Sequence, residues 1–192
     1  MKSLLILGHP KGCTTQTVTL CHSLLGFPTT GEVLNKKGRH PYFRKDDEFY
    51  QKATQWLLRV SQDHIVKDVI QPYACDRFLR DHPEAFNVIF IDRSVEDVHI
   101  SARLAGWIGQ KPEGWKKNLE RAKSIRDLFE RFPKITYEEL VFETAPLHNL
   151  LRSLGYTVTD CNYITPAFAR KRDATYRKLK AFKDARKSIF DP

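Results

Sequence analysis

The stretch LLILGHPKGCTTQT, residues 4–17, places anion-binding groups where a strand-like run gives way to a helical pattern. Unpaired backbone N–H groups and the positive end of the helix dipole allow a helix N-terminus to bind phosphate or sulfate oxygens. Lys11 adds a formal charge to this turn, and Thr14 and Thr15 add hydroxyl donors. The stretch therefore predicts an anion-binding loop, with an ordinary strand-to-helix turn as the alternative.

The loop does not match the nucleotide triphosphatase pattern, in which Gly and four further residues precede Gly-Lys-Ser/Thr. Counting from Gly8, the positions of the second Gly and of the Lys hold Cys13 and Thr14, and the lysine precedes the turn. Asp92 is not part of a clear acidic pair of the kind that a magnesium-nucleotide site uses. A magnesium-nucleotide loop is therefore disfavoured, and no metal site is predicted.

Strand-like and helical patterns alternate along the chain. Aliphatic runs at 4–7, 64–70, 87–92 and 134–137 predict strands, and helical spacing of apolar residues covers 14–25, 95–105 and 119–132. Because the strand runs look buried on both faces, the pattern predicts an α/β fold with a central, mainly parallel β-sheet flanked by helices.

The stretch 27–44, FPTTGEVLNKKGRHPYFR, is dense in Gly, Pro, Thr and charged residues. Such a composition predicts an irregular excursion, which we place near the C-terminal edge of the sheet. Ligands of open α/β sheets bind at that edge, so the excursion is a candidate for carrying specificity, with a plain surface loop as the alternative.

The length of 192 residues predicts a single domain over 1–192, ending in a basic helical segment at about 166–192. The net charge of +9 favours an anionic partner, and residues 170–187 alone hold nine Lys or Arg against two Asp. No apolar run approaches the ~20 residues of a membrane helix, and no signal-peptide pattern opens the chain, so we expect a cytoplasmic protein without a membrane span. The four cysteines lack metal-ligand spacing and are expected to be free thiols.

Three segments together resemble the sulfotransferase family. PKGCTT, residues 10–15, resembles the family's 5'-phosphosulfate loop, which usually reads Pro-Lys/Arg-Ser-Gly-Thr-Thr. VIFIDRSVEDVHIS, residues 88–101, is similar to the 3'-phosphate element, in which a Ser follows the Arg by eight residues. ITYEEL and LLRSLGY, within residues 135–156, look like the family's YEDL…LGL segment. The three segments occur in the family's order, and they depart from the family's pattern at Gly12-Cys13, where the family has Ser-Gly.

The resemblance implies a three-layer P-loop-like fold and 3'-phosphoadenosine 5'-phosphosulfate (PAPS) as the donor co-substrate, without a metal. It implies in-line transfer of the sulfuryl group to a hydroxyl or amine, in which Lys11 neutralises the leaving phosphate. The implied donor-binding residues are Lys11, Gly12, Cys13, Thr14, Thr15, Arg93 and Ser101. An Arg at the end of a buried strand also fits a phosphate on physical grounds, because its fork binds phosphate bidentately; pairing with Glu96 or Asp97 is the alternative.

The general base is expected to be Glu32, because some branches of the family use a glutamate in a Gly-Glu context at this distance after the loop. Lys67 is expected beside the transferring group, since Lys67 and Asp68 resemble a Lys-Asp-Pro segment of those branches. Other branches use a histidine, for which His64 is the candidate here. A solvated Glu32 and a Lys67–Asp68 ion pair are the structural alternatives.

Adenine stacking is expected from an aromatic residue, with Trp107, Trp115, Tyr156 and Phe168 as candidates. The acceptor is expected to be a small molecule or carbohydrate, and a nucleic acid is not expected. Two other functions stay open from the residues: a P-loop-type nucleotide-dependent kinase, and a non-catalytic module that binds anions or nucleic acid.

Overall fold

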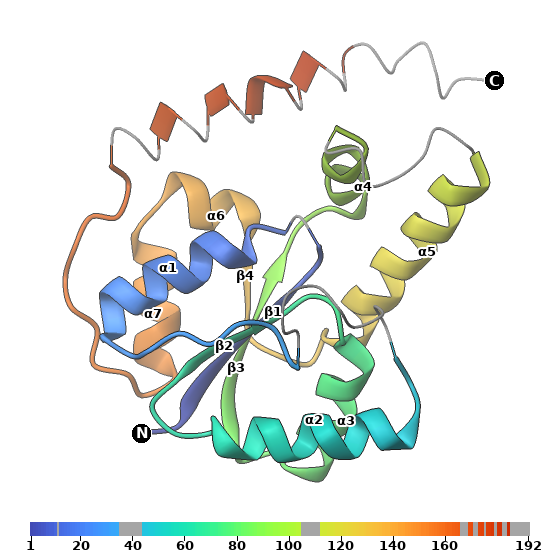
Figure 1. Cartoon of the computed structure of the whole chain (residues 1–192). Helices are drawn as coiled ribbons and strands as arrows, with labels where there is room; N and C mark the ends of the chain where they lie inside the picture. The colour runs from blue at the N-terminus through green and yellow to red at the C-terminus, as the bar shows by residue number, and fades with distance from the viewer. Residues whose placement is uncertain are drawn as a thin grey trace.

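The structure is a computed structural model that describes residues 1–10, 12–34, 44–104, 112–165, 169–170, 173–174, 176–178, 180–181 and 184, with the backbone alone at 103, 112–115 and 118. Strands and helices alternate along these residues (Figure 1). They follow in the order β1 (Ser3–Gly8), α1 (Thr14–Leu25), α2 (Asp47–Arg59), β2 (Ile65–Asp68), α3 (Pro72–Asp81), β3 (Phe86–Asp92), α4 (Val95–Leu104), α5 (Pro112–Leu128), β4 (Lys134–Thr136), α6 (Tyr137–Phe142) and α7 (Ala145–Ser153).

The four strands form one sheet in the order β2-β1-β3-β4, and every neighbouring pair is parallel. β1 is central, with Leu7 opposite Asp68 of β2 and Phe90 of β3. Parallel neighbours require crossover connections, which helices supply here. The predicted α/β fold with a parallel sheet flanked by helices is confirmed, and its layers are those of a three-layer P-loop-like fold.

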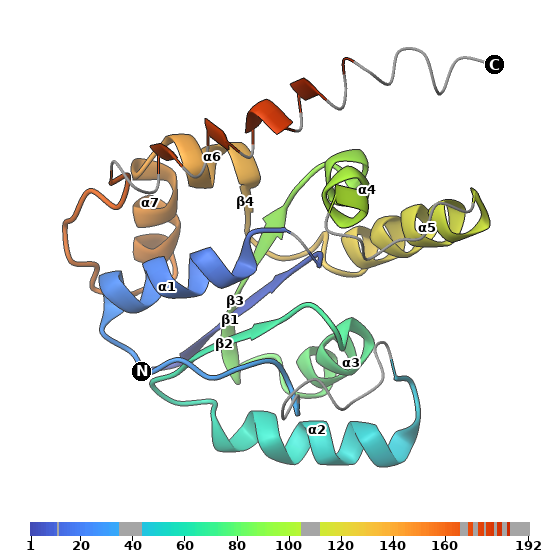
Figure 2. The same ribbon diagram turned by 45° about the horizontal axis from the view of Figure 1, so that its top comes forward.

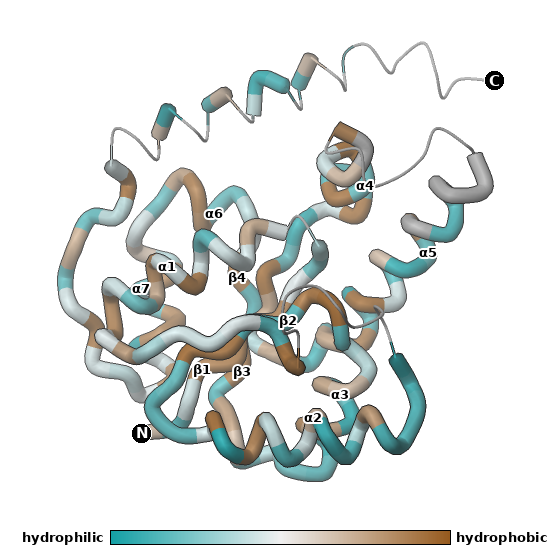
Figure 3. Tube along the Cα trace, in the orientation of Figure 1, coloured by the Kyte–Doolittle hydropathy of each residue, from teal (hydrophilic) through white to brown (hydrophobic). Residues whose placement is uncertain are grey.

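The sheet separates two apolar layers, because successive side chains of a strand point to opposite faces. Leu4 and Ile6 pack with buried residues of α1, α6 and α7, whereas Leu5 and Leu7 pack with those of α2, α3 and α5. Figure 2 shows the first group of helices above the sheet and α2 and α3 below it, and Figure 3 shows apolar residues gathered along the strands. This burial on both faces explains why the strand runs are apolar without interruption.

The predicted bounds of two elements are wrong. β2 ends at Asp68 instead of residue 70, because the chain turns there and the Gln71 N–H donates to the Asp68 carboxylate at 2.7 Å. α5 begins at Pro112 and ends at Leu128, earlier at both ends than the predicted 119–132. Phe129 and the residues after it form tight turns before Pro133 while still packing into the core, so their apolar spacing imitated a helix.

The excursion is irregular in its described residues, as predicted, and its first part runs along the outer edge of β2. The Ile65 N–H donates to the Pro28 carbonyl at 2.9 Å, and the Thr30 N–H donates to the Ile65 carbonyl at 2.8 Å. The chain then continues parallel to β2 toward the carboxyl end of that strand. Residues 35–43 of the excursion lie outside the described part of the chain.

The described residues between 169 and 184, which belong to the predicted basic segment at about 166–192, are helical. This segment lies above α6 in both views (Figures 1 and 2). There the ring of Tyr176 meets that of Phe142 edge-on, with 6.2 Å between centroids. Among the described residues, no helix combines the length and the apolar character needed to cross a membrane.

Leu57 and Leu58 offer a matched test of the layer beneath the sheet, because both lie in α2 but only Leu57 is buried. Leu57 is 0% exposed and Leu58 is 46% exposed. We expect Leu57→Ala to lower the free energy of unfolding by about 2–5 kcal/mol and Leu58→Ala by about 0.5 kcal/mol or less, measured by urea denaturation. Equal losses for the two variants would contradict the packing described for α2.

Candidate functional site

The predicted anion loop is a tight turn between β1 and α1 that is closed by glycines. The Gly12 N–H donates to the His9 carbonyl at 2.8 Å. A Cβ on Gly12 would lie 2.8 Å from that same carbonyl oxygen, and a Cβ on Gly8 would lie 2.6 Å from Cγ2 of Thr14. A larger residue at position 12 would therefore force the backbone apart, and one at position 8 would displace the Thr14 side chain.

Cys13 has a left-handed backbone conformation, with φ 73° and ψ 9°, at the residue that precedes α1. Its carbonyl accepts hydrogen bonds from the backbone N–H and the hydroxyl of Thr17, both at 3.1 Å, and its thiol donates to the Gln16 side chain at 2.6 Å. Glycine adopts this conformation without steric cost, which is the physical reason for a glycine at the matching position of the resembled loop. Cys13 thus carries the turn at an energetic cost, and the turn forms nevertheless.

The other residues of the loop are described in part. Thr14 is buried in the first turn of α1, and Thr15 is exposed beside it. Lys11, which we expected to neutralise the leaving phosphate, lies outside the described residues, as do Trp107 and Phe168. The side chain of Trp115 is also outside the described part.

Lys67 joins two of the predicted site residues. Its ammonium donates to the Thr15 hydroxyl at 2.7 Å and forms an ion pair with the Glu32 carboxylate at 3.2 Å. The two charged side chains are 20% and 15% exposed, for Lys67 and Glu32 respectively. Three segments that are distant in sequence, namely the start of α1, the excursion and the end of β2, therefore meet through one cation.

Glu32 reaches this position because the excursion follows β2 to its carboxyl end, where Val33 is fully buried in the layer beneath the sheet. His64 lies instead at the amino end of β2, where its N–H donates to the Ser3 hydroxyl and its Nδ1 lies 2.6 Å from the Gln62 carbonyl. The opposite ends of one strand thus separate the two candidate bases. Of the two, Glu32 is the one near the loop.

Arg93 immediately follows β3 and is only 4% exposed. Its guanidinium lies over the Tyr137 ring, 4.2 Å from the centroid. Burial raises the pKa of Tyr137, the positive charge of Arg93 opposes that rise, and the charge of Cys13 adds to it. Tyr137, at the start of α6, is therefore close to both the anion loop and the Arg expected to bind the 3'-phosphate.

Ser101 lies nearly two turns into α4 and is half-buried. The start of this helix is fixed by Ser94, whose hydroxyl accepts the Asp97 N–H at 3.0 Å. Asp97 is itself buried. The predicted strand, Arg and helix of the 3'-phosphate element thus occur in the expected order, with Arg93 at the junction.

His9, which directly follows β1, is another buried polar residue next to the loop. His9 is fully buried, and its ring packs edge-on against Phe90 with 5.6 Å between centroids. Burial is the main cause that lowers the pKa of His9 to about 4, while Asp92 opposes this shift and Arg126 and Arg93 add to it. Asp92 is paired with Arg126 at 2.9 Å. His9 is therefore neutral near pH 7, next to a compensated ion pair.

One candidate for adenine stacking is misplaced. Tyr156 is a buried core residue whose hydroxyl donates to the Lys2 carbonyl at 3.0 Å, and its ring packs edge-on against Phe27. Lys2 precedes β1, so Tyr156 lies at the amino edge of the sheet, away from the loop. The prediction is therefore wrong for Tyr156, because its aromatic ring serves the core.

Three residues near the site received no role from the sequence. Asp68 is buried at the end of β2, Tyr137 stacks on Arg93, and His9 lies behind the turn. Tyr137 ends a predicted strand and Asp68 lies near the carboxyl end of another, which is a usable signal in a parallel sheet. Within the described ranges, no group of three or more His, Cys, Asp or Glu residues is arranged to hold a metal ion.

No protein-family model matches the chain, and no curated protein matches it with significance. Among solved structures, the tunicamycin resistance protein of Deinococcus radiodurans is similar in fold, with a TM-score of 0.53 and 13% sequence identity. The superposition covers 83% of this chain and 99% of that chain. At this identity the similarity concerns the fold alone. Together, the sheet, its flanking helices and this neighbour define the class as a three-layer α/β protein of P-loop-like fold.

Cys13 provides a test of the turn. A non-glycine residue in the left-handed region costs about 1–2 kcal/mol, which glycine avoids at a smaller cost in unfolded-state entropy. We therefore expect Cys13→Gly to change the free energy of unfolding by no more than about 1 kcal/mol, whereas Cys13→Val should lower it by about 1–2 kcal/mol. Chemical denaturation checks both values, and a Val variant as stable as the Gly variant would argue against the left-handed turn.

Proposed function

We propose that the protein is a sulfotransferase that moves the sulfuryl group of PAPS to a hydroxyl or amine acceptor without a metal. One observation carries the proposal: Lys67 contacts both Thr15 of the loop helix and Glu32, at 2.7 Å and 3.2 Å. The resemblance assigns Thr15 to the donor loop, Glu32 as the base and Lys67 as the charge beside the transferred group. Their convergence from three segments supports the assignment.

The donor supplies a sulfuryl group whose sulfur bonds to the acceptor oxygen or nitrogen while its bond to the 5'-phosphate oxygen breaks, leaving adenosine 3',5'-bisphosphate with that electron pair. The tight turn at Gly8 and Gly12 keeps the backbone compact at the start of α1, where N–H groups and the helix dipole favour an anion. Lys67 adds a positive charge at the same helix end and thereby stabilises negative charge on the transferred group and the leaving oxygen.

Glu32 is proposed to accept the proton of the acceptor hydroxyl or amine. Its carboxylate is held by Lys67 and is mostly shielded from water, so it is oriented before the acceptor binds. A positioned carboxylate base contributes to rate by removing the proton as the new bond to sulfur forms. The ion pair with Lys67 links this proton transfer to the charge near the sulfuryl group.

Arg93 is proposed to bind the 3'-phosphate of the donor. Its buried guanidinium lies over the Tyr137 ring, close to Cys13 of the loop. A planar fork fixed in this way suits bidentate recognition of a phosphate. The two anionic ends of one adenosine compound then have separate partners, the loop at one end and Arg93 at the other.

Thermal unfolding with three ligands tests the proposed donor class. We expect adenosine 3',5'-bisphosphate to raise Tm by several degrees at about 100 times its Kd, because a ligand that binds only the native state stabilises it by about 2.7 kcal/mol at that concentration. ATP with magnesium and a generic oligonucleotide should leave Tm unchanged. Stabilisation by ATP-magnesium instead would favour the kinase, and stabilisation by the oligonucleotide alone would favour a binding module.

A matched pair of variants locates the bisphosphate in the same experiment. Arg93→Lys should reduce the bisphosphate-induced rise in Tm, because lysine lacks the planar fork. Arg59→Lys makes the same chemical change at the end of α2 and should leave the rise intact. An equal rise in both variants would remove Arg93 from the proposed site.

The role of Glu32 is tested by sulfuryl transfer from PAPS to a panel of carbohydrate, phenol and amine acceptors. We expect Glu32→Gln to lower kcat by about 10²-fold or more, the range for loss of a general base, while the bisphosphate still binds. Glu48→Gln removes an exposed glutamate from the first turn of α2 and should retain full activity. An active Glu32→Gln variant would show that another group removes the proton.

A further inference from the structure

Asp68 is a buried carboxylate at the end of β2, next in sequence to Lys67 but facing the opposite side of the sheet. It is 1% exposed. On that side lies Cys75 of α3, whose thiol pKa is raised well above its ordinary value by burial and then by the charge of Asp68. Burying a carboxylate in such an apolar layer is unfavourable unless the carboxylate accepts hydrogen bonds.

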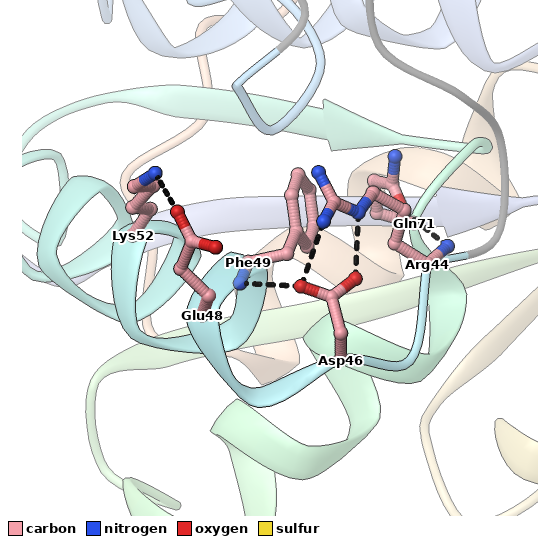
Figure 4. Close-up of polar contacts among 6 residues, drawn as sticks. All are labelled: Arg44, Asp46, Glu48, Phe49, Lys52 and Gln71. Atoms are coloured by element: carbon pink, nitrogen blue, oxygen red, sulfur yellow. Dashed lines mark hydrogen bonds and ion pairs between the residues drawn. The ribbon is translucent and has the colours of Figure 1, made fainter.

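The contacts of Asp68 reach both sides of the excursion that carries Glu32. The Gln71 N–H donates to the Asp68 carboxylate at 2.7 Å, and the Val33 N–H lies close enough to favour its charged form. The Gln71 side chain in turn accepts the Arg44 N–H at 3.0 Å, as Figure 4 shows. The residue that follows Glu32 is thus tied to Asp68 directly, and the return of the excursion is tied to it through Gln71.

Asp68 and Glu32 also interact through their charges. Burial is the main cause that raises the pKa of Asp68 to about 7, and the negative charge of Glu32 adds to it, while the N–H groups of Gln71 and Val33 oppose the rise. The titratable groups around Asp68 are Glu32 on the excursion, Lys67 on its own strand and Cys75 on α3.

We propose that Asp68 is a positioning residue for Glu32: its buried carboxylate accepts the backbone N–H groups of Val33 and Gln71 and so fixes the backbone beside Glu32. This inference rests on the proposed role of Glu32 as the base. It assigns the Lys-Asp pair at the end of β2 two separate tasks, one on each face of the sheet. Lys67 faces the transferred group, and Asp68 supports the loop that carries the base.

The contact itself is tested without any activity, by following the backbone amide signals of Val33 and Gln71 in the ¹⁵N-labelled full chain from pH 5 to pH 9. We expect both signals to shift with a midpoint near pH 7 and this step to be absent from Asp68→Asn. Asp76→Asn is the matched control, because Asp76 is also buried on this side of the sheet but pairs with Arg80 and Arg131. Amides that do not titrate near pH 7 in the native chain would overturn the proposal.

The pH dependence of stability checks that the variant folds. Unfolded Asp68 ionises near pH 3.8 and folded Asp68 near pH 7, so the folded chain binds the extra proton between these values. The native stability gained from Asp68 is therefore lost as pH rises through this window. We expect the difference between the Tm of Asp68→Asn and the native Tm to be more positive at pH 8 than at pH 5. A difference that does not change with pH would contradict burial of the charge.

The role in the reaction is tested by the ratio of native to Asp68→Asn kcat/KM across pH. The ratio should be near 1 at pH 5.5, where Asp68 is protonated, and rise to about 5-fold at pH 8, because the ionised carboxylate holds the N–H groups of Val33 and Gln71 more strongly. The change should appear in kcat and not in the KM for the donor. Asp76→Asn should show no such pH dependence. An active native chain with a pH-independent ratio overturns the role of Asp68 alone, whereas a native chain without transfer activity overturns the proposed function and this role with it.

Discussion

Parallel pairing of β1 with both β2 and β3 is the constraint on which the site depends. Because the strands run in one direction, the residues that follow them meet at one edge of the sheet. The turn at Gly12, the Lys67 side chain and Arg93 owe their proximity to this register, although they come from distant parts of the chain. The helices on either face exclude water from the strands, and so the charges at this edge lie against a rigid apolar body.

The sheet was predictable because burial on both faces requires uninterrupted aliphatic runs, which few other arrangements produce. Boundaries were less predictable, as the end of α5 shows: the aromatic residues after it keep helical spacing but pack from turns. α2 and α6 were not singled out, although Asp46 caps the first and Thr136 and Glu139 form a capping box on the second. These polar caps are local signals that a search for apolar periodicity passes over.

The candidate site was predictable where the backbone conformation of a turn restricts the residue type. It was less predictable where the site depends on which residues a long side chain contacts. The turn residue Cys13 takes the conformation for which the resembled loop uses glycine. The meeting of Lys67 with Thr15 and Glu32 depends on how the excursion follows the edge of β2, which spacing in the sequence does not encode. Tyr156 shows the opposite failure, since an aromatic residue reads the same whether it stacks on a ligand or fills a core.

The Gln71 side chain fixes the point at which the excursion returns to the sheet. Since Arg44 is secured by Gln71 and Val33 is buried beside β2, the residues between these two anchors are joined to a fixed frame. Doubling the length of such a connection costs only about 0.6 kcal/mol in closure entropy. A change in the length of this insertion is thus expected to leave the carboxyl edge of the sheet and its charged side chains in place.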